Sequence, residues 1–151
     1  MNTERERVAS WIKEAFRGVT LGNGVGLWEG RALDDYDDER GIASARLRDQ
    51  RSDWSAIPVE DLCECESSLT FADQEGVRFL LPAFMLAELD DKLPAGIVLT
   101  LTEHHRQAEH FGALSREQRR AVREFLLVLL DDPNATWPEE IGRSLETFWT
   151  E

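Results

Sequence analysis

The chain has 151 residues, of which 42% are hydrophobic and 9% aromatic, and its 30 acidic and 17 basic residues give a formal net charge of −13. A domain of this length buries about two-thirds of the surface of its unfolded chain, so the apolar content suffices for a core and excludes wholesale disorder. A surface this negative repels phosphate backbones, which disfavours nucleic acid as a partner and favours a protein with a basic surface.

The compartment follows from what the sequence lacks. No apolar run approaches the roughly 18 residues that cross a bilayer, and the first residues are acidic where a secretory signal is basic and then apolar. Two cysteines occur, Cys63 and Cys65, and chains that depend on disulfides carry more. We therefore expect a cytoplasmic protein with no membrane partner, folded as a single domain over residues 1–151.

The first third of the chain predicts three helices. Apolar residues recur at helical spacing between Val8 and Phe16, and Gly18 ends this helix. The glycine-rich segment 22–26 lacks the GxGxxG spacing and the GK[ST] ending of nucleotide loops, so it is expected to be a flexible turn. A short helix is expected over 27–36. A mostly exposed helix over 42–50 then brings bases within reach of the acidic run 34–39.

The middle of the chain is ambiguous at one place. Trp54 and Ile57 are expected to anchor the chain in the core, ahead of a helix over 59–65. Residues 69–81 alternate as in a β-hairpin, but Asp73 also suits the cap of a helix whose apolar face continues to residue 89. We favour the helix because its apolar spacing continues beyond Pro82, which is expected to kink or split it.

The last third predicts two further helices. Residues 97–101 are apolar and β-branched, which indicates a lone strand or an extended packing segment. Ser115 and Gln118 form a capping-box pattern ahead of a helix to residue 130, and Pro138 begins an amphipathic helix that ends near Trp149. The expected fold class is therefore mainly α, a compact domain of about five to seven helices with a short hairpin or lone strand as its β content.

No catalytic or metal-binding pattern stands out. The three histidines, His104, His105 and His110, do not share a helix face or an HExxH pattern, so we interpret them as exposed turn residues. A Cys-x-Cys pair supplies two of the four ligands that zinc needs, and the acidic run lacks the spacing of a calcium loop, so no metal or cofactor is expected. No GxSxG nucleophile pattern occurs, and no catalytic residue is assigned.

Two acidic stretches are the candidate binding surface. Six acids and one base lie between Glu29 and Glu39, and seven acids and no base lie between Asp53 and Glu75. Such a surface attracts a basic protein, although it also serves solubility. The expected partner-binding residues are Asp34, Asp35, Asp37, Asp38, Glu39, Glu60, Asp61, Glu64 and Glu66.

Several patterns together carry a resemblance. They include a Gly26-x-x-Glu29 start, an Asp53-Trp54-x-x-Ile57-Pro58 segment and, as the most specific, Arg78-Phe79-x-Leu81-Pro82-Ala83. With these the chain resembles, over most of its length, an uncharacterised bacterial family of small single domains. By analogy of size and acidity, the resemblance implies a protein-binding module such as an immunity protein that neutralises a basic bacterial toxin. It assigns no functional residue.

Three residues are expected to have structural roles: Trp54, Arg78 and Pro82. A lone arginine within an apolar run usually forms an internal ion pair, for which Asp34 or Asp35 is the expected partner. The alternative to a binding module is an enzyme of unrecognised type that uses Arg78 with one of these carboxylates, or the histidines, in a cleft. The oligomeric state is not predicted.

Overall fold

The computed structural model describes residues 3–151 and contains, within them, ten α-helices, one 3-10 helix and no strand. The expected mainly α class is confirmed, but the expected number of helices is too low. The helices that the sequence did not indicate are α5 (Ser68–Phe71), α7 (Val98–Thr102) and α8 (Gln107–His110). They are only four or five residues long, so they are too short to show a helical period in their apolar residues.

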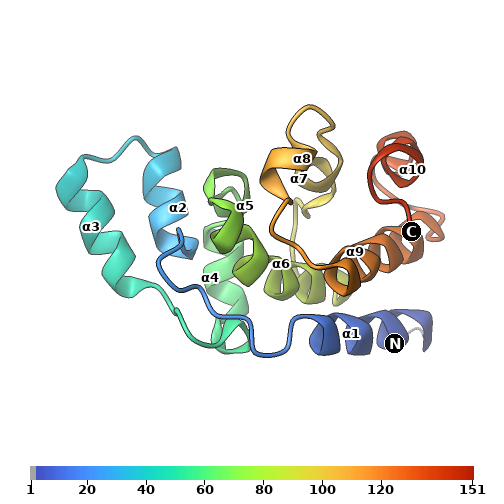
Figure 1. Ribbon diagram of the computed structural model, residues 1–151, viewed down its shortest axis with the longest axis horizontal. Helices are drawn as coiled ribbons and strands as arrows, with labels where there is room; N and C mark the ends of the chain where they lie inside the picture. Colours follow the sequence, from blue (N-terminus) through green and yellow to red (C-terminus); the bar gives the residue numbers. More distant parts are fainter. Residues whose placement is uncertain (1–2) are drawn as a thin grey trace.

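Three long helices form the centre of the body of the molecule. α1 (Thr3–Ala15) packs against both α6 (Gln74–Leu89) and α9 (Arg116–Leu130), and α10 (Pro138–Thr147) covers α9 from the other side (Figure 1). Eleven of the sixteen residues of α6 are buried. The core is therefore built around α6, as its apolar sequence predicts.

The helix prediction for the ambiguous segment is confirmed, and the hairpin alternative is wrong. The Asp73 carboxylate accepts a hydrogen bond from the backbone N–H of Gly76, which caps α6. α6 runs unbroken from Gln74 to Leu89 with Pro82 inside it, so Pro82 does not split the helix. The burial of the residues on both sides of Pro82 offsets the backbone hydrogen bond that a proline cannot donate.

The lone strand expected over 97–101 is also wrong, since Val98–Thr102 is the helix α7. The Glu88 carboxylate accepts from the backbone N–H of Ile97 at 2.7 Å, immediately before the helix. Within residues 3–151 no strand is available for pairing, so this segment forms a helix, in which its backbone N–H and C=O groups hydrogen-bond with one another. Its buried side chains, Val98 and Leu101, then pack toward α10.

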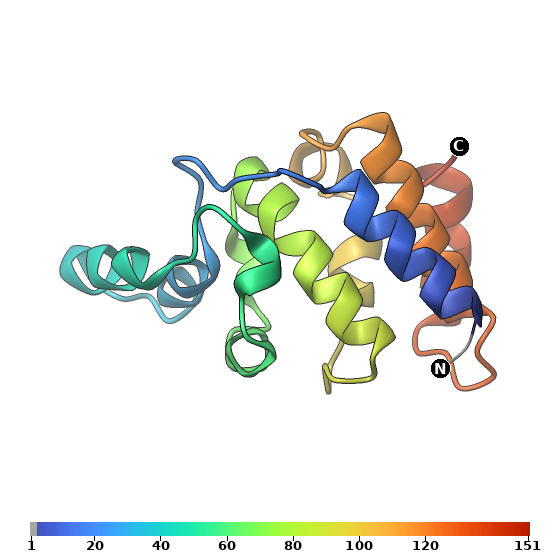
Figure 2. The same cartoon turned by 90° about the horizontal axis from the view of Figure 1, so that it is seen from below.

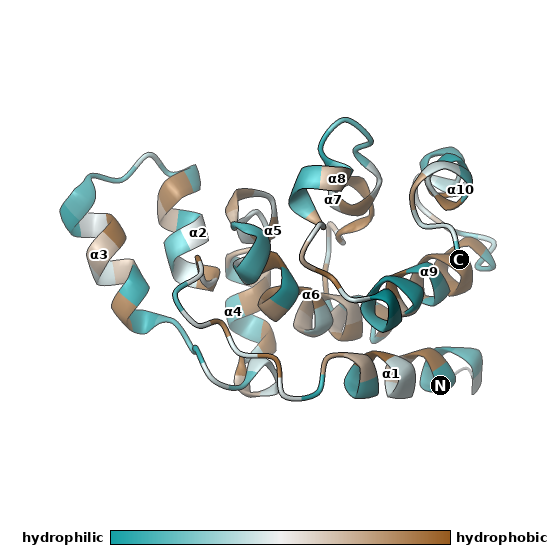
Figure 3. Ribbon diagram, in the orientation of Figure 1, coloured by the Kyte–Doolittle hydropathy of each residue, from teal (hydrophilic) through white to brown (hydrophobic). Residues whose placement is uncertain are grey.

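The opposite end of the molecule is an arm made of α2 (Leu27–Asp34) and α3 (Glu39–Arg48), residues 27–48. It lies at the end far from both termini, and α3 is outermost (Figures 1 and 2). α2 packs on α5, whereas α3 packs mainly on α2 and buries none of its residues. The exposed helix expected here is confirmed, and Figure 3 shows that it nevertheless carries hydrophobic segments.

The chain passes from the arm back to the body through η1 (Trp54–Ala56) and α4 (Val59–Glu64). Trp54 and Ile57 are buried, as expected of anchors, and the Trp54 indole N–H donates to the carbonyl of Phe16 at 2.9 Å. Trp54 thus has the structural role expected of it, since it joins η1 to the residue that follows α1. Among residues 3–151, no helix combines the length and apolar character that crossing a membrane requires.

Candidate protein-binding surface

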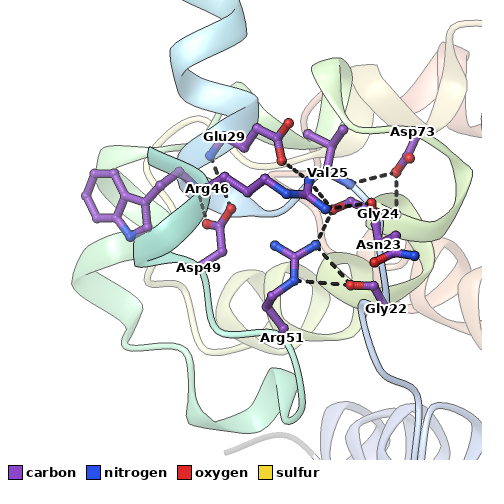
Figure 4. Close-up of polar contacts among 11 residues, drawn as sticks. Gly22, Asn23, Gly24, Val25, Glu29, Arg46, Asp49, Arg51 and Asp73 are labelled. Atoms are coloured by element: carbon purple, nitrogen blue, oxygen red, sulfur yellow. Dashed lines mark hydrogen bonds and ion pairs between the residues drawn. The ribbon is translucent and has the colours of Figure 1, made fainter. Parts of the chain in front are cut away.

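The arm is fixed to the body through the glycine-rich segment. Arg51 donates two hydrogen bonds to the carbonyl of Gly22 and one, at 2.8 Å, to that of Gly24 (Figure 4). Arg46, from α3, donates to the carbonyls of Asn23 and Gly24. Arg46 and Arg51 therefore form a brace: their hydrogen bonds to the carbonyl groups of residues 22–24 fix the segment that was expected to be a flexible turn.

The N-terminus of α2 is capped by a residue from the end of α3. Asp49 accepts hydrogen bonds from the backbone N–H groups of Trp28 at 2.6 Å and Glu29 at 3.3 Å. Arg46 also forms an ion pair with the nearly buried Glu29 at 2.6 Å. Burial raises the pKa of the Asp49 carboxyl, and the two backbone hydrogen bonds oppose this shift. The two helices of the arm are thus held together at their base.

A further carboxylate joins the glycine-rich segment to α6. Asp73 accepts from the backbone N–H of Val25 at 3.0 Å while it caps α6 through Gly76 (Figure 4). The carbonyl of Val25 lies so close to Gly76 that a Cβ at this position has no room. Phosphate loops present free N–H groups to an anion, whereas here the chain's own carboxylates accept from those of Val25 and Trp28. This geometry does not form a nucleotide loop.

The tip of the arm carries Tyr36, the last residue of the helix expected over 27–36, where the sequence offered it for burial. Tyr36 has φ +56° and is 94% exposed. The N–H of Asp37 donates to the carbonyl of Ala32, and that of Tyr36 to the carbonyl of Leu33, which is the Schellman ending of a helix. Glycine is the residue that normally occupies this left-handed position. The sequence signal for the tip is therefore a helix that ends at a tyrosine flanked by aspartates, with no glycine to take the left-handed position.

The acidic residues expected to bind a partner lie mainly on the surface. Among residues 3–151, no ion pair involves Asp37, Glu39 or Glu60, and all three are exposed. Asp38 is exposed but also caps α3 by accepting from the N–H of Gly41 at 2.8 Å. Asp34 is half-buried and accepts from the hydroxyl of Ser67 at 2.7 Å.

The structure brings the two acidic stretches together in part. Arg31 lies 2.7 Å from Glu64 of α4 and 3.6 Å from Asp35. Asp35, Asp37 and Glu64 line one depression of about 370 Å³ between α2 and α3. The Arg48 guanidinium, at 3.6 Å from the centroid of the Trp28 ring, forms another part of its wall. Arg46 of α3 therefore pairs with Glu29, and Arg48 of α3 lies on the Trp28 ring. Neither pairs with the acidic run 34–39.

The remaining expected residues lie elsewhere. Asp61 lines a separate depression of about 400 Å³ on the side of Pro58 and Arg51. Glu66 accepts from the backbone N–H of Ala95, and burial raises the pKa of its carboxyl. Glu66 thus belongs to the packing of the body more than to the acidic face.

The ion pair expected of Arg78 does not form. Asp34 and Asp35 bind Ser67 and Arg31, and within residues 3–151 Arg78 has no acidic partner. Its Nε atom is buried without a hydrogen-bond partner. Arg78 belongs to α6 in the body, so the cleft of arginine and aspartate that the enzyme alternative requires is not assembled.

The histidines do not converge either. His104 and His105 are exposed as expected and line a depression of about 450 Å³, in which His105 lies 3.1 Å from Glu103. His110 is buried, contrary to expectation, and its Nε2 is satisfied by a hydrogen bond with the carbonyl of Leu69 at 2.9 Å. No three or more His, Cys, Asp or Glu side chains in the described part of the chain are grouped as metal ligands.

The cysteines are free thiols in different surroundings. Burial raises the pKa of Cys65 to about 11, against the opposing effect of Arg31, so this thiol stays protonated and unreactive at neutral pH. Cys63 is half-buried and its Sγ lies 3.2 Å from the carbonyl of Lys92. Neither geometry indicates a nucleophile.

Comparison with protein families gives one match, to a model described as a family of unknown function (DUF6714), over residues 4–151. The chain belongs to the DUF6714 family. This confirms that the domain is of an uncharacterised type, and the DUF6714 description assigns it no activity. Neither the curated proteins nor the solved structures gave a match.

Proposed function

We propose that this chain is an acidic protein-binding module that docks onto a basic protein through the tip of the arm. The observation that carries the proposal is Tyr36, a 94% exposed aromatic side chain at a backbone position that favours glycine, between Asp35 and Asp37. A left-handed non-glycine residue costs about 1–2 kcal/mol. An exposed tyrosine does not repay that cost within the chain, which supports a role outside it.

The surroundings of Tyr36 suit protein recognition. Tyrosine is enriched among the residues that dominate binding energy at interfaces, because it buries a large area with few rotatable bonds. Leu47, on the same arm, is 88% exposed, and α3 leaves all its side chains at least partly accessible. A partner that covered the arm would bury apolar surface that the chain itself leaves in water.

The charge around the tip selects the partner. Asp37 and Glu39, which follow Tyr36 in the chain, are exposed carboxylates without an ion pair among residues 3–151. Glu60, in α4 and outside the arm, is a third such carboxylate. Uncompensated carboxylates accelerate encounter with a basic surface and disfavour acidic partners. The brace at the base of the arm holds the tip in place, which lowers the entropic cost of docking.

The partner class that this chemistry fits is a protein whose own functional face is basic, such as a bacterial toxin that acts on nucleic acid. In that setting the chain acts in the cytoplasm as an immunity protein that covers the basic face. The support is the charge of −13 together with the exposed acidic tip.

The proposal is tested by affinity capture from the cells in which the chain is produced naturally, at low and at high ionic strength. We expect a basic protein that is retained at low salt and released at high salt, because the attraction is between exposed charges. Tyr36→Ala is expected to abolish capture. Co-production of the captured protein with the chain then tests whether it is toxic and whether the chain neutralises it.

Trp137 offers a matched control. It is also an exposed aromatic residue with positive φ, +57°, but it lies at the start of α10, outside the arm. Trp137→Ala is expected to leave capture unchanged. Equal capture by the Tyr36 and Trp137 variants, or the lack of any salt-sensitive partner, contradicts docking through the tip.

A further inference from the structure

An apolar groove lies outside the arm, in the body of the molecule. It has a volume of about 540 Å³ and is bounded by the end of α1, by η1, by α4 and by the second half of α6, and α6 contacts each of the other three elements. Its wall is mainly apolar and includes Trp54, Ile57, Leu62, Leu86 and Ala87. Grooves of this size and lining are typical of sites for small ligands.

Charged residues also line the groove, and most of these are already paired. Arg17 lies 2.6 Å from Glu14, and Asp90 lies 3.8 Å from Lys92. Asp53 accepts two hydrogen bonds from Ser55, at 2.6 and 3.0 Å. The charges at these points of the rim are therefore at least partly compensated by the chain itself.

Lys13 differs from the other charged residues of the rim. It is exposed at the end of α1, lines the groove, and makes no hydrogen bond or ion pair with residues 3–151. Acidic residues outnumber basic ones in this chain, so an unpaired ammonium group beside an apolar groove distinguishes this site from the rest of the surface. It offers one positive charge to a ligand whose remaining surface is apolar.

We propose that this groove binds a small apolar carboxylate, with the hydrocarbon part against Trp54, Leu62 and Leu86 and the carboxylate at Lys13. The site is built from other elements than the arm, so it goes beyond the proposed docking function and does not depend on it. Burial of the hydrocarbon supplies most of the affinity, and Lys13 selects the head group.

The test measures binding of decanoate, decanol and decylammonium to the full chain at low ionic strength by calorimetry, below the concentrations at which these compounds form micelles. We expect saturable binding of decanoate, about two- to fivefold tighter than decanol, which is the range for an exposed ion pair. Decylammonium is expected to bind more weakly than decanol. Because Trp54 lines the groove, a change in tryptophan fluorescence on binding is a second readout.

Two variants and one control locate the ligand. Lys13→Ala is expected to reduce decanoate affinity to that of decanol, which should itself be unaffected. Leu86→Trp, at a half-buried position, fills the groove and is expected to abolish binding of all three compounds. Arg116→Ala removes an equal charge at an exposed position outside the groove and is expected to change nothing.

Some results overturn the proposal. Decanoate that fails to bind, or that binds the Leu86→Trp variant as before, removes the groove as the site. Equal binding of all three compounds, or equal effects of Lys13→Ala and Arg116→Ala, means that the groove accepts any apolar chain and that the carboxylate assignment is wrong. Because Lys13 is exposed, loss of the fold does not explain an effect of its replacement.

Discussion

α6 and α3 are both regular helices, but the rest of the molecule uses them in opposite ways. α6 buries eleven of its sixteen residues and tolerates a proline in its interior, whereas α3 buries none of its ten. α6 is therefore stabilised by burial of apolar surface. α3 depends instead on hydrogen bonds and ion pairs at its ends, from Asp38 at one end and from Arg46 and Asp49 at the other.

The difference shows how a small domain separates stability from recognition. The body satisfies the requirement for a core, so the arm is free to expose side chains that a core would bury. Tyr36 and Leu47, both in the arm, are 94% and 88% exposed, and the arm lies at the end of the molecule farthest from the termini (Figure 1). This difference between body and arm predicts distinct effects of four substitutions.

The largest effect is expected in α6. Phe84 is fully buried, so Phe84→Ala leaves a cavity and should lower the free energy of unfolding by about 3–5 kcal/mol. Leu47→Ala in α3 is the matched control and should change it by less than about 0.5 kcal/mol. Urea denaturation of both variants measures the difference. Similar losses would show that the arm is part of the core in energetic terms.

The next effect is expected at the base of the arm. Asp49→Ala removes the cap of α2, and the loss of such a cap costs about 1–2 kcal/mol. Amide hydrogen exchange should become faster in residues 27–48 and stay unchanged in α6, because the arm opens locally. Asp49→Asn keeps an acceptor oxygen and should lose less protection. Uniformly faster exchange across the chain contradicts an arm that opens by itself.

At the tip, a substitution should stabilise the protein and remove its proposed function. Tyr36→Gly relieves the left-handed strain of a non-glycine residue, so the free energy of unfolding should rise by about 1 kcal/mol. Thermal denaturation measures this gain, and affinity capture measures the expected loss of the partner. A variant that is more stable and still captures the partner would show that Tyr36 is not the contact.

The smallest effect concerns pH and the buried His110. Burial lowers the pKa of His110, and Arg106 lowers it further, while Glu103 and Glu109 oppose the shift. The unfolded chain then binds the proton more tightly, so the stability that His110 contributes is fully present above about pH 6.5 and is lost as the pH falls toward the folded pKa.

His110→Gln should therefore flatten the decline in the free energy of unfolding between neutral and mildly acidic pH. Asp49, Glu66 and Glu88 have pKa values raised by burial, so their contribution has the opposite sign and is lost as the pH rises. The difference between the native chain and the variant isolates His110, since both keep these carboxyls. Parallel pH profiles would mean that His110 does not titrate on unfolding.

Part of this architecture could be predicted from the sequence. The cap at Asp73, the capping box of Ser115 and Gln118, and the helix that begins at Pro138 were readable because a cap and a helical period are properties of neighbouring residues. The segment of α7 predicts a lone strand or an extended packing segment, because β-branched residues favour strands locally. No partner strand exists in residues 3–151, and that fact belongs to the whole fold.

The candidate surface was predicted less completely. The exposed carboxylates of the arm follow from the charge distribution, but their meeting with Glu64 around Arg31 depends on how α4 packs beside α2. The ion pair proposed for Arg78 was wrong because sequence does not show that other groups already occupy Asp34 and Asp35. Tyr36 and Lys13 gained their significance from exposure and from missing partners, which are three-dimensional properties.

Composition and spacing along the chain thus account for most of the helices, for the core along α6 and for the acidity of the surface. Three features follow only from the folded chain: the hydrogen bonds that fix the glycine-rich segment, the position of α3 as the outer face of an arm, and the apolar groove beside Lys13. The physical reason is that burial, pairing and concavity arise from residues far apart in sequence, such as Gly22 with Arg51 and Lys13 with Leu86.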